Sequence, residues 1–256
     1  SSPKANYVTQ QMVDELSLKF LNTGINDDIY EWVTNIIGSP WEQTSYSNLI
    51  PGTNDIHIFL CDIKNDNSSN GGTLGSFYGG NNYLKTSVAK SNEKLMFVID
   101  AVLLATPSGG SWELSDYWPM ATVSTLAHEF QHMIHFYQKT IKYNVSSSTA
   151  VNEMASLCIE DLLASKIMTN GPRGVAYGTA NAGAPMNTQG RLPGYNTRNY
   201  YNLLDWSGND DEVYLNYSKT YAFGAYLIRN YGGANLIKQL VQSGYTGASN
   251  IVDAVS

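Results

Sequence analysis

Apolar and polar positions in the first hundred residues predict helix first and then three short strands. Residues 8–37 have the apolar spacing of helix, interrupted by turn residues at 22–27. Residues 55–63 (DIHIFLCDI) alternate between apolar and polar side chains and are rich in isoleucine, which is typical of a strand. Residues 74–80 (LGSFYGG) and 94–100 (KLMFVID) predict two further strands.

Two long helices are predicted in the middle of the chain. Residues 120–142 carry an apolar stripe at helical spacing, and His128 and His132 fall outside that stripe. Residues 150–168 carry a second stripe, and Thr149 is placed to cap the N-terminus of that helix. The first stripe comprises Val123, Leu126, Ala127, Phe130, Ile134 and Tyr137, and the second Val151, Met154, Ala155, Cys158, Ile159, Leu162 and Leu163.

A long polar segment separates these helices from the end of the chain. Residues 171–215 are rich in Gly, Pro, Asn and Tyr. A loop of this length inside a domain is usually functional or contains short elements. Residues 218–233 and 234–244 then predict two closing helices. Strands that come early and helices that follow indicate an α+β fold with two lobes.

The composition narrows the classes of partner. The chain has 256 residues, enough for one large domain or two lobes with a sizeable core. Its formal charge of −7 argues against nucleic acid and anionic membranes, which attract basic surfaces. The longest apolar run, residues 95–105, contains Asp100 and is too short to span a bilayer. Cys61 and Cys158 could form a disulfide in a secreted protein, but two unpaired buried thiols are the preferred interpretation.

Three of the four histidines lie within residues 128–135, and two of them form the pattern HExxH around Glu129. In a helix, residues i and i+4 share one face, so His128 and His132 can converge on one zinc ion. Glu129 points to the side, where it can act as general base on an activated water without binding the metal. The alternative is a chance occurrence on a surface helix, which the scarcity of histidine in this chain disfavours.

A catalytic zinc site needs a third protein ligand. The extended pattern HExxHxxGxxH is excluded, because its glycine and final histidine positions hold His135 and Gln138. Glu153 lies 21 positions after His132, on the polar side of the second long helix, and is the predicted third ligand. A solvated surface carboxylate is the alternative interpretation of Glu153.

The assignments of two nearby side chains stay open. Glu160 is seven residues after Glu153 on the same helical face, so it could accept the second N–H of a metal-bound histidine. A solvated carboxylate explains Glu160 nearly as well, and its neighbour Asp161 is a weaker candidate for the same role. His135 lies either at the mouth of the site or, as we prefer, on the surface.

The segments TLAHEFQHMIHF (125–136) and VNEMASLCIED (151–161) resemble the gluzincin metallopeptidases, and most closely the hyicolysin family of secreted bacterial neutral proteases. The three predicted strands resemble that family's strands in the same order. The resemblance implies a thermolysin-like catalytic unit with a zinc cleft between two lobes. These would be an N-terminal α/β lobe with a mixed sheet (residues 1–143) and a mainly helical C-terminal lobe (residues 144–256).

The resemblance also implies roles for individual residues. The implied zinc ligands are His128, His132 and Glu153. The implied general base is Glu129. In the related aminopeptidases, the tyrosine of a Tyr-x-Lys-Gly segment stabilises the transition state. Tyr221 matches that tyrosine at the start of a predicted helix, although Phe223 occupies the lysine position. Tyr217, one turn earlier, is an alternative donor.

Those aminopeptidases also carry an acidic segment that grips the free N-terminus of a substrate, and we find no counterpart of it here. At the corresponding place the chain has GSFYGG, which as an edge strand could pair with a substrate backbone. The residues predicted to bind substrate are Ser76, Phe77, Tyr78 and Gly79. This segment has no carboxylate for an α-amino group, which favours an endopeptidase.

The sequence therefore predicts a secreted zinc endopeptidase that acts on protein or peptide as a monomer, with one catalytic Zn²⁺. Two alternatives stay open: a zinc aminopeptidase, and an inactive domain that binds peptide or a host protein. Calcium is possible but not supported. The Asp/Asn clusters at residues 64–70 and 207–212 are more often plain turns, and neither fits an EF-hand loop.

Overall fold

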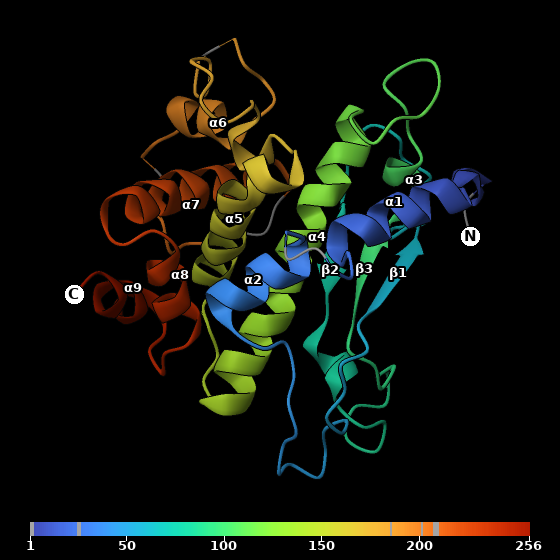
Figure 1. The fold of residues 1–256 in the computed structure, drawn as a ribbon. Coiled ribbons are helices and arrows are strands. Elements are labelled where there is room, and N and C mark those ends of the chain that lie inside the picture. Colours follow the sequence, from blue (N-terminus) through green and yellow to red (C-terminus); the bar gives the residue numbers. More distant parts are fainter. Residues whose placement is uncertain (1–2, 25–26, 185, 201, 207–209) are drawn as a thin grey trace.

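The computed structural model describes residues 3–24, 27–184, 186–200, 202–206 and 210–256 (Figure 1). The strands are β1 (His57–Cys61), β2 (Gly75–Phe77) and β3 (Met96–Asp100). The longer helices are α1 (Gln10–Phe20), α2 (Ile29–Ile37), α4 (Tyr117–His135), α5 (Thr149–Ile167), α7 (Asp210–Asn230), α8 (Ala234–Val241) and α9 (Gly247–Val255). The short helical elements are η1 (Pro3–Tyr7), η2 (Gly79–Asn82), α3 (Ala101–Leu104), the π-helical turn η3 (Phe136–Lys142), η4 (Gly171–Arg173) and α6 (Arg191–Thr197).

The three strands form a small mixed sheet in the order β1-β3-β2. β1 runs parallel to β3, with Leu60 opposite Ile99, and β2 runs antiparallel to β3, with Phe77 opposite Phe97. The three predicted strands and the mixed α+β class are therefore confirmed. Because β2 is at the edge of this sheet, one side of its backbone has no strand partner within the described residues.

Helix α4 lies at the centre of the molecule, between the sheet and the C-terminal helices (Figure 1). Its apolar stripe is buried as predicted, and the ring of Phe130 lies 5.1 Å from that of Phe20 and 5.6 Å from that of Tyr30. One continuous apolar cluster extends from Met12 to Ala254 and includes residues from both predicted lobes. The core thus fixes α4 against α5, and the division at residue 143 stays a prediction.

Helix α5 packs along α4 and carries the second predicted stripe. Thr149 is the first residue of α5 and not its cap, because the extended residue before the helix is Ser148. The helix ends at Ile167, and the next residue, Met168, has the left-handed φ of 62°. The long polar segment that follows contains two short elements, η4 and α6, as its length suggested.

The helix predicted from residue 218 begins earlier than the apolar pattern indicates. It is α7, which starts at Asp210, so Tyr221 lies in the middle of a long helix and does not open one. The last predicted helix is confirmed as α8. Cys61 and Cys158 are both free thiols as preferred from the sequence, but only Cys158 is buried, and Cys61 is half-buried. Within the described residues, every helix is too short or too polar to cross a membrane.

Candidate metal centre

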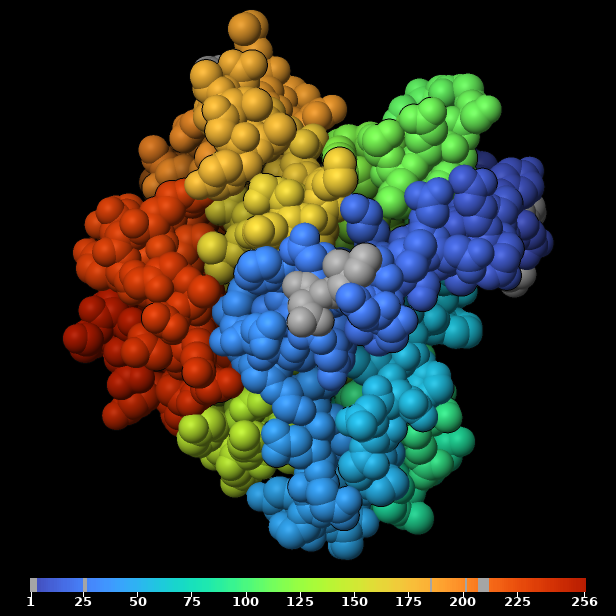
Figure 2. All heavy atoms as spheres, in the orientation of Figure 1, coloured from blue at the N-terminus to red at the C-terminus, as the bar shows by residue number. Residues whose placement is uncertain are grey.

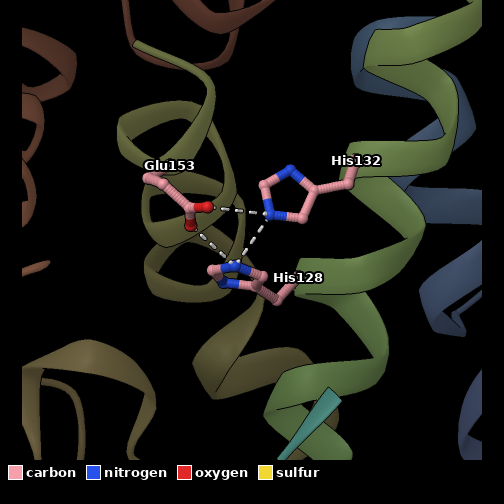
Figure 3. A group of neighbouring side chains, drawn as sticks. All are labelled: His128, His132 and Glu153. Atoms are coloured by element: carbon pink, nitrogen blue, oxygen red, sulfur yellow. Dashed lines mark hydrogen bonds and ion pairs between the residues drawn. The ribbon is translucent and has the colours of Figure 1, made fainter. Parts of the chain in front are cut away.

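Helix α4 presents His128 and His132 on one face, and α5 presents Glu153 to both of them (Figure 3). The two histidine Nε2 atoms lie 3.1 Å apart. One Glu153 oxygen lies 3.1 Å from His128 Nε2, and the other lies 3.5 Å from His132 Nε2. Ligands at 2.0–2.1 Å from a tetrahedral zinc ion are roughly 3.3 Å from one another. The three side chains therefore have the spacing that a zinc ion requires.

Hydrogen bonds behind the two histidines fix which ring nitrogen faces the cluster. His128 Nδ1 lies 2.7 Å from a Glu160 oxygen, and Ser124 donates its hydroxyl proton to the other Glu160 oxygen at 2.5 Å. Because a carboxylate only accepts, His128 donates its Nδ1 proton to Glu160, and Nε2 is the nitrogen that faces His132 and Glu153. Glu160 therefore lies where it could accept the second N–H of His128, and its role beside a bound metal stays a prediction.

His132 is oriented by a partner, Ser156, that was not predicted. Ser156 donates its single hydroxyl proton to the side-chain oxygen of Gln131. The Ser156 oxygen can then only accept from His132 Nδ1, which lies 3.1 Å away. This again makes Nε2 the nitrogen that faces the cluster. The signal was present in the sequence, because Ser156 is three residues after Glu153 and so on the same side of the helix.

The cluster is buried, and charge compensation dominates its ionisation. Burial lowers the pKa of His128, but its hydrogen bonds to Glu153 and Glu160 outweigh burial and raise that pKa well above its usual value. Burial raises the pKa of Glu153, but the charge of His132 and the hydrogen bond from His128 outweigh it and hold the pKa far below its usual range. Glu153 is therefore anionic at neutral pH.

Glu129 is next to the cluster but is not part of it. It is 5 % exposed, and burial raises the pKa of its carboxyl against the opposing effects of His128 and His132. A Cβ added at Gly75 on β2 would lie 2.7–2.8 Å from the Glu129 side chain. The edge strand therefore approaches the carboxylate so closely that a larger residue at position 75 would displace it.

A cleft of about 510 Å³ opens in front of Glu129 and His128. The residues that line it lie just before β2, in the N-terminal half of α4, in and after α5, at the start of α6 and in α7. Figure 2 shows the surface hollowed at the top of the view, between the green loop before α4 and the orange α6 segment. A cleft of this size with a few convergent polar groups is the usual form of a small-molecule or peptide site.

The tyrosine prediction is wrong in its choice of residue. Tyr221 is 0 % exposed, does not line the cleft, and donates its hydroxyl to Asp161 at 2.9 Å. Tyr217, one turn earlier on α7, does line the cleft, and its ring lies 6.3 Å from the His128 ring. Tyr217 and Tyr221 are one turn apart on the same side of α7, and the resemblance that selects Tyr221 does not show which of these turns meets the cleft.

The residues predicted to bind substrate, 76–79, are not among those that line the cleft. The cleft is lined by residues 71–75, immediately before Ser76. Phe77 and Gly79 pack against Phe136 instead: the two phenylalanine rings are 5.9 Å apart, and a Cβ at Gly79 would lie 2.6 Å from the Phe136 ring. Ser76 and Tyr78 are exposed, and their contact with substrate stays a prediction.

His135 and the acidic segments also have clear places in the described structure. His135 is buried, not on the surface as preferred, and burial lowers its pKa to about 3. Asp161 faces away from the cluster and pairs with Arg173 and Arg229. In the 64–70 segment, Asp66 accepts a hydrogen bond from the backbone of Ser68, as in an ordinary turn. Residues 207–209 of the other segment lie outside the described residues.

Two histidines and a glutamate that converge beside a buried carboxylate and a cleft are the arrangement of a metallopeptidase centre. Comparison with known proteins agrees with this class: the sequence model of the Peptidase M30 family matches residues 1–256. The chain belongs to that family. It is also 23 % identical over 244 residues to the "Neutral metalloprotease ShpI" of Staphylococcus hyicus. The alignment covers 93 % of this chain and 47 % of that protein, so the chain spans about half the length of its relative.

Proposed function

We propose that this chain is the catalytic unit of a secreted zinc endopeptidase. The observation that carries the proposal is the convergence of the ligand atoms of His128, His132 and Glu153 within 4.8 Å of one another, beside the Glu129 carboxylate. A zinc ion bound there supplies a Lewis acid that activates water and polarises a peptide carbonyl. The match to a neutral metalloprotease supports peptide as the substrate class.

Each neighbouring side chain has a definite task in this chemistry. Glu129 accepts a proton from the attacking water and later returns it to the leaving amine, for which its raised pKa is suited. Tyr217 donates its hydroxyl to the developing oxyanion. Burial and the Glu153 carboxylate raise the pKa of Tyr217, so its hydroxyl keeps its proton at neutral pH. Glu160 and Ser156 hold the two histidines in orientation.

The charges in the cleft support an endopeptidase over an aminopeptidase. An aminopeptidase needs a carboxylate that is free to bind the α-amino group of its substrate. Among the described residues that line the cleft, the carboxylates are Glu129, the proposed base, and Glu160, which is already bonded to His128 and Ser124. Peptides with a blocked N-terminus should therefore be cleaved as well as free ones.

The proposed function is tested by measuring zinc content and casein hydrolysis on the same sample. We expect one zinc per chain after dialysis, hydrolysis that stops when a chelator removes the metal, and recovery when zinc is restored. A protein with stoichiometric zinc and no hydrolysis of casein or peptides would favour the inactive binding domain instead. Loss of the metal without loss of hydrolysis would exclude zinc catalysis.

Tyr217→Phe tests the proposed oxyanion donor, because it keeps the ring and removes only the hydroxyl. We expect kcat to fall by about 10–10³-fold with little change in KM, since the hydrogen bond strengthens only as charge develops on the carbonyl oxygen. Tyr221→Phe is the matched control, because it removes a hydroxyl from the same helix outside the cleft. Tyr221→Phe should lower the melting temperature and leave kcat nearly unchanged. The reverse pattern would return the role to Tyr221.

A further inference from the structure

The cleft contains a single cationic side chain that the proposed mechanism does not use. Among the described residues that line it, Arg191 is the one lysine or arginine. The carboxylates of Glu129, Glu153 and Glu160 lie on or beside the same cleft. A bound zinc ion would compensate two of these three negative charges. Arg191 therefore stands as the one positive group of the cleft wall that is not required by the metal chemistry.

Within the described part of the chain, Arg191 is held in place by stacking on two aromatic rings. Its guanidinium lies over the ring of Tyr214 at 5.2 Å and over the ring of Tyr217 at 5.0 Å. Stacking uses the faces of the guanidinium and leaves its N–H edge for acceptors in the plane. Among the described side chains, no carboxylate pairs with Arg191, whereas Arg173 and Arg229 both pair with Asp161.

The local backbone is built to present this residue. Arg191 is the first residue of α6, and the hydroxyl of Tyr214 on α7 donates to the carbonyl oxygen of Gly190 at 2.7 Å. A Cβ at Gly194 would lie 2.4 Å from the Tyr214 ring and 2.6 Å from the Ser218 hydroxyl, so α6 packs on α7 as closely as glycine allows. An arginine that is positioned before a ligand arrives loses less entropy on binding it.

The position of Arg191 also relates it to the cleavage site. Tyr217 contacts Arg191 on one side and His128 on the other, with ring centroids 6.3 Å apart for the second contact. An extended peptide advances about 3.3 Å per residue. The path from Arg191 through the Tyr217 ring to His128 therefore corresponds to the length of one to three residues of substrate. A group bound by Arg191 therefore belongs to a residue close to the scissile bond.

We propose that Arg191 is a specificity residue that binds a carboxylate of the peptide substrate within three residues of the scissile bond. The carboxylate is either an aspartate or glutamate side chain or the C-terminal carboxylate of a short peptide. Arginine binds both in the same bidentate manner. The inference rests on the proposed peptidase function and adds to it a substrate class, acidic peptides.

The test compares matched peptides on the zinc-loaded protein. One set has both termini blocked and carries Glu or Gln at each of the three positions on either side of the cleaved bond. A second set has Gln throughout and ends one to three residues after that bond as a free acid or an amide. We expect kcat/KM to be about 10–100-fold higher for the carboxylate member of at least one pair, as for a charge-assisted hydrogen bond. The pair that responds identifies the source of the carboxylate.

Three variants connect the preference to Arg191. Arg191→Met keeps much of the stem and should bring the ratio within the responding pair close to one, while Arg191→Lys should retain part of it. If the substitution also disturbs Tyr217, kcat/KM falls equally for both members of a pair, and their ratio does not change. Arg198→Met is the matched control, because Arg198 follows the same helix, is exposed and does not line the cleft. It should leave the ratio unchanged. Ratios near one in every pair of the wild-type protein, or a preference that survives in Arg191→Met, would overturn the inference.

A binding measurement separates failure of this inference from failure of the proposed function. Zinc-loaded Glu129→Gln protein, titrated with the same peptides, should bind the carboxylate member of the responding pair about 10–100-fold more tightly. This comparison does not depend on turnover. Cleavage of all peptides without any carboxylate preference would overturn the role of Arg191 and keep the peptidase. Preferential binding by Arg191 without cleavage by the wild-type protein would keep Arg191 and overturn the peptidase.

Discussion

Glu129→Gln is expected to retain zinc and the fold while hydrolysis falls by at least the 10²–10⁴-fold that loss of a general base costs. The glutamine has the same shape and fits beneath Gly75, whose backbone leaves no room for a larger group. It cannot accept a proton from the attacking water. Residue 129 is not among the three proposed ligands, so zinc content should stay at one per chain.

The measurement pairs metal analysis with kcat/KM on a blocked peptide. Glu15→Gln on α1, which makes the same chemical change far from the cleft, is the control and should retain full activity. If Glu129→Gln loses zinc together with activity, the separation between metal binding and base catalysis is wrong. Near-normal turnover with zinc retained would exclude Glu129 as the base.

Local spacing explains why the centre of the site could be predicted. The i, i+4 relation of His128 and His132 depends only on helix geometry, and Glu153 follows on the polar face of the next helix. The buried stripes of α4 and α5 then require the two helices to pack in one orientation, and that orientation brings Glu153 to both histidines. Three strands with clear apolar patterns were predicted for the same reason.

The errors arise where tertiary packing decides the outcome. The resemblance selects Tyr221, but it does not show which turn of α7 meets the cleft: Tyr221 bonds to Asp161, and Tyr217 lines the cleft. Polarity suggested a surface position for His135, yet it is buried, with Gln131 beside its ring. Similarly, Lys139 is fully buried because its ammonium donates to the carbonyl oxygens of Ser243 and Tyr245, about a hundred residues away.

Arg191 lies in the part of the chain with the weakest local pattern. The surrounding segment, residues 171–215, is rich in glycine, proline, asparagine and tyrosine, and this composition predicts only a long loop. Its place in the cleft depends on α6 packing against α7, which Gly194 and the Tyr214 hydroxyl allow. Residues that select a substrate are commonly carried on such loops over a rigid core, and these are the residues that periodicity does not reveal.

Glu153→Ala is expected to remove both zinc and activity. The substitution deletes the anionic ligand and leaves two histidines, whereas a catalytic zinc site uses three protein ligands. Loss of a residue that hydrogen-bonds to a metal ligand typically lowers metal affinity by about 10–100-fold. Loss of the ligand itself should lower zinc affinity by more than this. Dialysed protein should contain little zinc, and added zinc should no longer raise the melting temperature, because only a metal that binds the folded state stabilises it.

Glu160→Gln provides the graded comparison that separates a ligand from a partner of a ligand. The amide oxygen can still accept the Nδ1 proton of His128, but the negative charge is lost. We expect zinc affinity to fall by about 10–100-fold, with activity recovered at high zinc concentration. Excess zinc should not restore Glu153→Ala to the same level, because no side chain replaces the missing ligand. If Glu153→Ala keeps stoichiometric zinc and full activity, Glu153 is not the third ligand. If Glu160→Gln is the more damaging change, the two glutamates have exchanged roles.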